Sequence, residues 1–132
     1  MAVQLAISTR NARLDAIETD LGTSPVLEIR TGAQPADCAT ADSGTLLASL
    51  TLPSDWMAAA AAGSKAKSGT WQDLAADAAG VAAHFRIKTS GAVCKLQGSC
   101  GIGTGDLQLD NTNIAVGQTV TVTAFTLTDA NA

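Results

Sequence analysis

The chain has 132 residues, a formal net charge of −4, and two Trp, two Phe and no Tyr. This length suits one domain, and the lack of a lysine- and arginine-rich block argues against binding nucleic acid, which depends on neutralising phosphates. No apolar run approaches the roughly 20 residues of a membrane span, and no secretory signal is recognisable, so we expect a cytoplasmically made protein with no nucleic-acid or membrane partner.

The first predicted element is a helix within residues 6–22. Its apolar residues recur at helical spacing and form one narrow stripe: Leu14, Ile17 and Leu21. We expect Ser8 or Thr9 to cap the start of the helix, and Gly22 and Pro25 to end it. The stripe would lie on a sheet or a neighbouring subunit; the alternative is a flexible arm that becomes ordered only on assembly.

The hydrophobic period changes to two after residue 24. We therefore divide the chain into an N-terminal helix or arm, 1–24, and a mainly β domain, 25–132. Alternation with one polar face is typical of antiparallel sheets, and the short strands indicate an antiparallel β-sandwich or jelly-roll-like fold. The predicted inward-facing residues are Leu27, Ile29, Leu46, Ala48, Leu50, Leu52, Val81, Ala83, Phe85, Ile87, Cys94, Leu96, Leu107, Leu109, Val120, Val122, Phe125 and Leu127.

The long connection over residues 54–69 contains an alanine run compatible with one or two helical turns starting near Ser54. Trp56 and Trp71 flank it and would either anchor an interface or cover the open end of the sandwich. Lys65 and Lys67 would form a solvated basic tip or touch an acidic neighbour in an assembly. The expected interface residues are Leu14, Ile17, Leu21, Trp56, Met57, Lys65, Lys67 and Trp71.

The segment 80–100 contains the only histidine and two of the three cysteines. We interpret it as a strand, a turn at Ser90 and Gly91, and a second strand. His84 would then lie exposed on the polar face of the strand. We do not expect it to be a catalytic base, because a base needs an orienting partner and a nucleophile. Alternation places Cys94 on the opposite, core face.

The three cysteines are expected to be free, buried thiols that act as small hydrophobic groups. The spacing of Cys94 and Cys100 does not match a zinc knuckle, and Cys38 would have to join them from a distant loop. A zinc site and a Cys94–Cys100 disulfide are minor alternatives. We predict no catalytic, cofactor-binding or metal-binding residue, and no cofactor.

The last two segments are a glycine loop and a closing strand. The G-x-G-x-G run at 101–105 has the wrong spacing for a dinucleotide-binding loop, and a strand follows it, so we expect a flexible loop. In the closing strand, Val122 and Phe125 break the alternation. A β-bulge near Ala124 would return both to the core; otherwise the strand is buried on both faces.

Four segments follow one another in a recognisable order: LEIRTGAQPA, GTLLASLTL, WMAAAAAGSKAKSGTWQDLAADAAGVAAHFRI and LDNTNIAVGQTVTVTAFTLTDAN. Within them lie an R-T-G-x-Q-P turn, an A-D-A-x-G-x-A-x-x-F-R strand and a closing N-T-x-I-x-x-G-Q-x-V-x-V-x-x-F-T strand. This order resembles a widespread group of small virion proteins of tailed bacteriophages. The resemblance covers nearly the whole chain from about residue 5.

The resemblance implies structural work without catalysis. It suggests a capsid cement or decoration protein, made in the bacterial host cytoplasm and carried in the virion. Its partners would be the major capsid protein and further copies of itself, as a homo-oligomer. The N-terminal helix and the 54–69 loop would carry the contacts. A tail, neck or fibre component is the alternative, and a carbohydrate-binding module using Trp56 and Trp71 is a further one.

Overall fold

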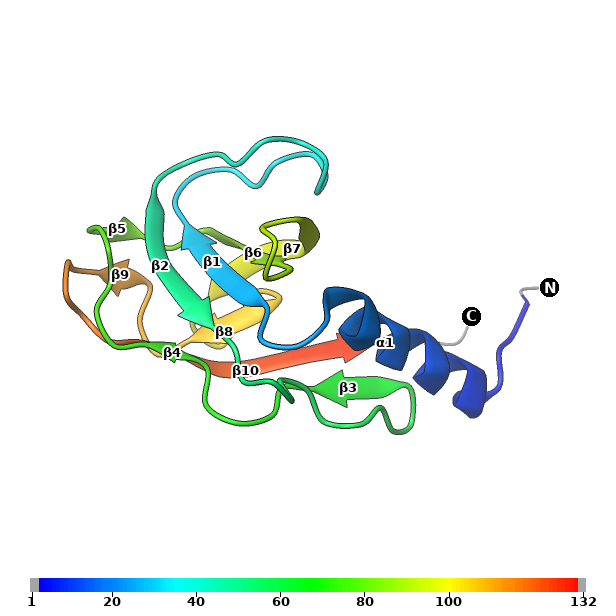
Figure 1. The fold of residues 1–132 in the computed structure, drawn as a ribbon. Coiled ribbons are helices and arrows are strands. Elements are labelled where there is room, and N and C mark those ends of the chain that lie inside the picture. The colour runs from blue at the N-terminus through cyan, green and yellow to red at the C-terminus, as the bar shows by residue number, and fades with distance from the viewer. Residues whose placement is uncertain (1–2, 131–132) are drawn as a thin grey trace.

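The computed structural model describes residues 3–130, which form one helix and ten strands (Figure 1). The elements are α1 Ile7–Leu21, β1 Val26–Arg30, β2 Leu46–Thr51, β3 Ser64–Ala66, β4 Gln72–Asp73, β5 Gly80–Val81, β6 His84–Lys88, β7 Cys94–Gly101, β8 Leu107–Leu109, β9 Asn113–Ile114 and β10 Val120–Thr128. The prediction of a mainly β chain with one N-terminal helix is confirmed.

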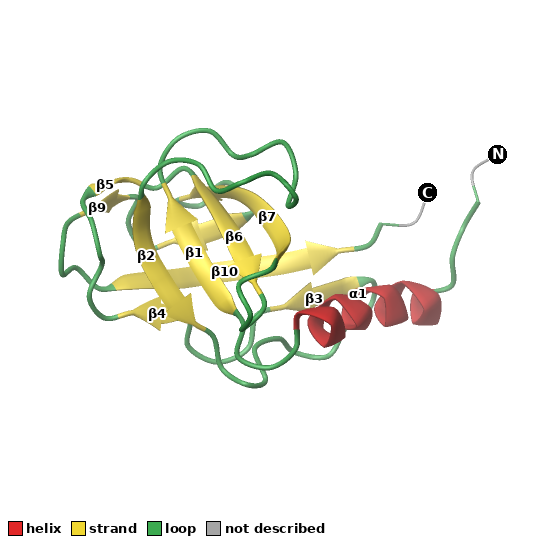
Figure 2. Cartoon of the chain, turned by 45° about the horizontal axis from the view of Figure 1, so that its top comes forward, coloured by secondary structure: helices red, strands yellow, loops and turns green. Residues whose placement is uncertain are grey.

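The main sheet follows the order β2-β1-β6-β7-β8-β10-β3, with β4 also paired to β10. Its neighbours are antiparallel except for β7 and β8, which run parallel. The sheet curls until β4 meets β2, where the Ser49 N–H donates to Asp73 Oδ2 at 3.0 Å. Figure 2 shows the resulting barrel-like body, with the small β5–β9 ribbon at one end and α1 at the other. Strands thus face one another across the core, although this order does not confirm a jelly roll.

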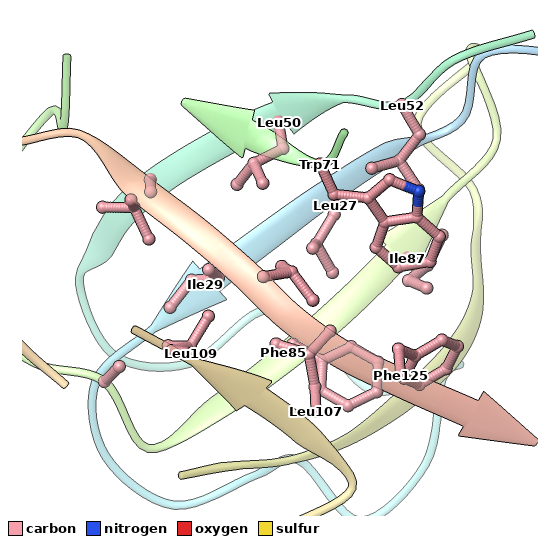
Figure 3. Packing of buried hydrophobic residues seen from close by; sticks show 14 of the residues in the cluster. Leu27, Ile29, Leu50, Leu52, Trp71, Phe85, Ile87, Leu107, Leu109 and Phe125 are labelled. Atoms are coloured by element: carbon pink, nitrogen blue, oxygen red, sulfur yellow. The ribbon is translucent and has the colours of Figure 1, made fainter. Parts of the chain in front are cut away.

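All four aromatic side chains of the sequence form one chain through the core. The ring centroids of Trp56 and Trp71 are 5.9 Å apart, and Trp71 lies 5.6 Å from Phe125. Phe125 in turn meets Phe85 edge-on at 5.6 Å. Figure 3 shows Trp71, Phe85 and Phe125 among the aliphatic side chains that surround them. The few aromatic residues are therefore concentrated where they bury the most surface.

The predicted alternation is confirmed over most strands. Buried as expected are Leu27, Ile29, Ala48, Leu50, Leu52, Phe85, Ile87, Leu107, Leu109, Val120, Val122 and Phe125. The β-bulge near Ala124 is also confirmed, because the pairing of β10 with β8 shifts between Val122 and Ala124. The extra residue lets both Val122 and Phe125 face the core.

Two strands depart from the predicted alternation. In β2 the register shifts opposite Ile29 and Arg30, so Leu47 is buried while Leu46, predicted to face inward, is only half-buried. The strand predicted to start near Val81 is broken, because β5 pairs with β9 and β6 begins only at His84. Val81 is therefore exposed, and Ala82 rather than Ala83 is buried.

The alanine run over 58–62 forms a β-hairpin with β3, not helical turns. Ala61 and Ser64 exchange backbone hydrogen bonds of 2.9 Å, and the two residues between them, Ala62 and Gly63, both have positive φ. This is the geometry of a two-residue hairpin turn of type I′. The high helix propensity of alanine is overridden by this turn and by the packing of α1 on β3.

Helix α1 begins without a side-chain cap. Its N-cap residue is Ala6 in an extended conformation, so Ser8 and Thr9 lie inside the first turn and the predicted cap is wrong. The C-terminal end is as predicted: Gly22 has a φ of 80°, and its N–H donates to the Glu18 carbonyl at 3.0 Å. Over residues 3–130 no helix is long and apolar enough to cross a membrane.

The glycine run at 101–105 allows a very short return between the parallel strands β7 and β8. Parallel neighbours ordinarily need a crossover of a dozen residues or more, but here only 102–106 connect them. A Cβ on Gly101 would lie 2.5 Å from the Thr104 carbonyl oxygen, and Gly103 and Gly105 have positive φ. These glycines therefore have a local role in the backbone path.

Candidate functional site

The outer face of β1, β6 and β7 is covered by residues 31–45, which we call the cover loop. His84 lies beneath it with 1% of its surface exposed, and its Nδ1 is 3.0 Å from the Gly32 carbonyl oxygen. Its Nε2 is buried with no hydrogen-bond partner in the described part of the chain. The expectation of an exposed histidine is wrong, because the cover loop folds over the polar face of the hairpin. The hairpin itself is confirmed, since β6 and β7 pair antiparallel across a turn that includes Ser90 and Gly91.

Five charged residues under and beside the cover loop form what we call the outer cluster: Glu28, Arg30, Asp42, Arg86 and Lys88. Asp42 is its centre and comes from the loop, whereas the other four come from β1 and β6. Asp42 accepts from Arg86 Nη1 at 2.6 Å, from Lys88 Nζ at 2.7 Å and from Arg30 Nη2 at 3.2 Å. Glu28 forms the second anionic site, with Arg30 at 3.0 Å and Lys88 at 2.9 Å.

Electrostatics favour the charged state of the outer cluster. Hydrogen bonding from Lys88, followed by that from Arg86, lowers the pKa of Asp42 despite partial burial. Burial alone would lower the pKa of Lys88, but hydrogen bonds to Asp42 and Glu28 outweigh this effect and raise it. Because Asp42 of the cover loop pairs with three cations of the strands, the cluster fastens the cover loop to the sheet.

Arg86 extends this fastening to the backbone of the cover loop. The residue is 1% exposed, and its Nη2 donates to the carbonyl oxygens of Cys38 at 3.0 Å and Asp37 at 3.2 Å. On the neighbouring strand, Gln97 Nε2 donates to the Pro35 carbonyl at 2.8 Å. The loop is thus held along its length by side chains that sequence periodicity assigned to a solvated face.

Cys94 lies on this outer face and not in the core as predicted. The register of β6 and β7 shifts between Ile87 and Lys88, which places Cys94 opposite Lys88 and Leu96 opposite Ile87. The Sγ atom of Cys94 is 2.8 Å from that of Cys38 in the cover loop. Cys100 lies apart from this pair, packed against the core cluster.

A second set of contacts seats α1 on the 57–67 hairpin, and its centre is Lys65. The Lys65 side chain is 1% exposed, and its Nζ lies 2.6 Å from Asp15 and 2.7 Å from Glu18, both on α1. Burial alone would lower the pKa of Lys65, but the hydrogen bonds to these two carboxylates raise it. The expectation of a solvated tip is therefore wrong for Lys65. Its acidic partners are Asp15 and Glu18 of the same chain.

Further polar contacts join α1 to the rest of the chain. Asn11 Oδ1 accepts from the Gly63 N–H at 2.9 Å, and Arg13 pairs with Asp129 at 3.2 Å. Trp56 Nε1 donates to the Gly22 carbonyl at 3.1 Å, just beyond the end of the helix. In this structure α1 thus packs on its own chain.

The eight expected interface residues fall into two groups. Leu14, Leu21, Trp56, Met57, Lys65 and Trp71 are buried within the chain, and both tryptophans are 0% exposed. Ile17 is half-buried against the core cluster. Lys67 is half-exposed, donates to the Gly69 carbonyl at 2.9 Å and lies 5.9 Å from the Trp71 ring centroid. The tryptophans are thus part of the core, while the interface assignment stays a prediction.

The structure brings together residues that sequence reasoning did not join. Glu28 pairs in register with Arg86 across β1 and β6, and opposite charges on facing strands are a readable signal of such pairing. The role of Asp42 carries no comparable signal, because it depends on where an irregular loop folds. Within residues 3–130 we find no group of three or more His, Cys, Asp or Glu residues placed to hold a metal ion.

We expect acid to remove the contribution of Asp42 to the stability of the folded chain. The pKa of Asp42 is lowered in the folded chain, so its contribution to stability is full above the unfolded pKa of about 4 and is lost as pH falls through the lower folded value. The free energy of unfolding should be level between about pH 8 and 5 and fall below about pH 4. Urea denaturation at a series of pH values measures this.

The Asp42→Asn variant should be less stable than the unaltered chain at neutral pH and should lose less stability in acid. Asp55→Asn, a change of another exposed carboxylate residue, is the matched control and should keep the full acid dependence. An unchanged acid dependence in Asp42→Asn would contradict the assignment.

No family model, curated protein or solved structure that was compared with this chain matches it.

Proposed function

We propose that the chain is a non-enzymatic structural protein of a bacteriophage virion, which cements or decorates the capsid through its N-terminal arm and the neighbouring hairpin. Its partners would be the major capsid protein and further copies of itself. The observation that carries the proposal is that the two segments expected to make the contacts, the helix and the 54–69 region, lie against each other and form one end of the molecule (Figure 1).

The surface at this end suits repeated, closely packed contacts. Both segments expose small side chains: Ala12, Ala16, Ala58, Ala59, Ala61 and Ala62. Alanine loses no side-chain rotamer freedom when it is buried, so covering it has a low entropic cost. The arm also exposes Val3 and Ile7, which are 83% and 55% exposed. Apolar groups placed on a projecting arm gain free energy when a neighbour covers them.

The motifs behind the phage resemblance have structural roles in this fold. In the R-T-G-x-Q-P turn, Arg30 joins the outer cluster, Gly32 adopts positive φ and the Pro35 carbonyl is held by Gln97. In the second motif, a Cβ on Gly80 would lie 2.9 Å from Thr31 and 3.0 Å from Leu47. These residues are used to build the scaffold, which supports a structural role.

Counting copies in purified particles tests the proposal. For a phage that encodes this chain, quantitative mass spectrometry of purified virions should find it in numbers comparable to the major capsid protein, because a cement protein follows the capsid lattice. A copy number that matches one ring of subunits per particle would support the neck or tail alternative. Absence from the particle would reject both. For the carbohydrate-binding alternative, Trp56 and Trp71 provide no exposed stacking surface.

We expect Ala12→Arg to lower incorporation into particles about tenfold or more. Arginine is a good helix former, so α1 should persist, but a long charged side chain would prevent close approach at the arm. A loss of about 1.4 kcal/mol of contact free energy corresponds to tenfold in occupancy. Complementation of a deletion phage, followed by mass spectrometry of particles, measures it. Ala79→Arg, which changes another exposed alanine at the opposite end near β5, is the control, and equal incorporation of both variants would contradict the role of the arm.

A further inference from the structure

Two cysteine side chains from distant parts of the sequence meet on the outer face. Cys38 lies in the middle of the cover loop, and Cys94 is the first residue of β7. Their Sγ atoms are 2.8 Å apart. A disulfide bond is about 2.05 Å long, so a relative movement of the two sulfur atoms of less than about 1 Å would join them.

The position of Cys38 is set by contacts on both sides. Arg86 Nη2 donates to the carbonyl oxygens of Asp37 and Cys38 itself. Immediately after it, the Thr40 N–H donates to Asp37 Oδ1 at 2.8 Å and forms a tight turn. Cys94 is placed by the pairing of β7 with Lys88 of β6. The two thiols are therefore brought together by the fold and not by a freely moving loop.

We propose that Cys38 and Cys94 form a reversible disulfide that locks the cover loop onto β7, by exchange with a small-molecule disulfide such as oxidised glutathione. One protein thiolate attacks a sulfur of oxidised glutathione, which breaks its S–S bond and releases one glutathione thiol. The second protein thiolate then attacks the protein-bound sulfur of the mixed disulfide, which forms the Cys38–Cys94 bond and releases the second glutathione. Two protein thiols are oxidised and one oxidised glutathione is reduced, with two protons released from the protein and two taken up by the glutathione thiolates.

The reduced pair persists where no oxidant is supplied. Burial, together with the contact with the Cys94 thiol, raises the pKa of the Cys38 thiol to about 11. This thiol is therefore protonated at neutral pH and is a weak nucleophile, so the exchange is slow. Cys100 differs in position, because it packs against the core cluster and not beside another cysteine. Burial raises the pKa of its thiol to about 12.

Closing the bond should stabilise the folded chain measurably. The bond would link residues that are 56 positions apart, and cross-linking a long loop restricts the unfolded chain more than the folded one. The midpoint of thermal unfolding should rise by about 5–15 °C on oxidation, as expected for a domain of this size.

Peptide mapping of the full chain tests the proposal. The purified protein is fully reduced, incubated with oxidised glutathione, alkylated, and digested without reductant. The oxidised protein should lose the mass of two hydrogen atoms and yield one cross-linked pair of peptides, containing Cys38 and Cys94. Cys94→Ser and Cys38→Ser should each abolish the cross-link and the rise in melting temperature. Cys100→Ser is the matched control and should retain both.

Three results would overturn the proposal: a cross-link involving Cys100, a stable mixed disulfide with glutathione and no cross-link, or no reaction in a chain that remains folded by circular dichroism. A Cys38–Cys94 cross-link that leaves the melting temperature unchanged would overturn the locking role. Mapping the unaltered chain decides the pairing even where a serine variant folds poorly.

Discussion

Replacing Trp71 with alanine is expected to destabilise the folded chain by about 3–5 kcal/mol and to lower its melting temperature by roughly 10–20 °C. Trp71 is 0% exposed and lies between two rings of the aromatic chain, those of Trp56 and Phe125. Truncation would remove the largest type of side chain from the core and leave a cavity between its neighbours. A domain with a total stability of about 5–15 kcal/mol would lose a large part of it.

The loss should be large for a reason specific to this composition. Apart from the four aromatic residues and Met57, the buried core consists of Leu, Ile, Val and Ala, and each of the other three aromatic residues already fills its own place in the aromatic chain. The indole Nε1 also donates to the Ser68 carbonyl at 3.1 Å, so truncation leaves that buried contact unmade. The variant Trp71→Phe keeps a ring but loses this hydrogen bond, and we expect it to have an intermediate stability.

Urea and thermal denaturation followed by circular dichroism measure these differences. Leu74→Ala is the matched control, because Leu74 lies three positions away and is 69% exposed; its effect should stay within about 0.5 kcal/mol. If Trp71→Ala were as stable as Leu74→Ala, the aromatic chain would not be a main source of core stability.

The inner face of the sheet could be predicted from sequence because a half-buried strand alternates in its side chains. Leu27 and Ile29, or Phe85 and Ile87, alternate with polar residues, and the structure buries all four. The bulge in β10 could also be predicted, since one inserted residue lets Val122 and Phe125 face the same core; the alternative, a strand buried on both faces, is not what the structure shows. Burial of one face of a strand makes every second residue apolar, and this alternation can be recognised within a few consecutive residues.

The outer face could not be predicted in the same way. Glu28, Arg30, Arg86 and Lys88 alternate as water-facing residues do, yet the cover loop lies over them. Its position depends on contacts such as Asp42 with Arg86, which are 44 residues apart. Charged residues buried in pairs look identical in sequence to solvated ones, so nothing in the sequence shows that His84 is covered. The prediction for Cys94 fails for another reason, the register shift between Ile87 and Lys88.

The predicted helical turns are replaced by a hairpin over 57–67 because helix propensity is a weak prior. Five consecutive alanines favour a helix, but Gly63 supplies positive φ at the turn and the side chain of Lys65 is fixed by α1. The decisive interaction is between the first helix and a segment about 50 residues later. Sequence periodicity within either segment does not contain that information.

Neutralising the two carboxyl partners of Lys65 is expected to destabilise the chain more than removing Lys65 itself. In the double variant Asp15→Asn/Glu18→Gln the ammonium group stays buried beside neutral amides, and the Ala58 carbonyl oxygen at 2.9 Å is a further uncharged acceptor. Leaving a buried charge unpaired costs about 3–5 kcal/mol. In Lys65→Met the carboxylates lose their partner, but they reach solvent, because their side chains are 49% and 24% exposed.

The triple variant, which combines Lys65→Met with both neutral partners, should recover much of the loss. It contains no buried charge, and an unbranched apolar side chain fills nearly the same space, an exchange that is often neutral or stabilising. Stability should therefore increase from the double variant, to Lys65→Met, to the triple variant. If the triple variant were as unstable as the double variant, shape or helix propensity would explain the loss and the unpaired charge would not.

Asp20→Asn on the same helix separates this effect from a general change in charge. Asp20 pairs with Lys95 at 3.3 Å, and both side chains are well exposed, so its removal should change stability by less than about 1 kcal/mol. Urea denaturation of the full set should place Asp20→Asn beside the unaltered chain. Because α1 is seated mainly through Lys65, the double variant should also loosen the arm, and it should therefore lower incorporation into particles under conditions in which the β domain remains folded.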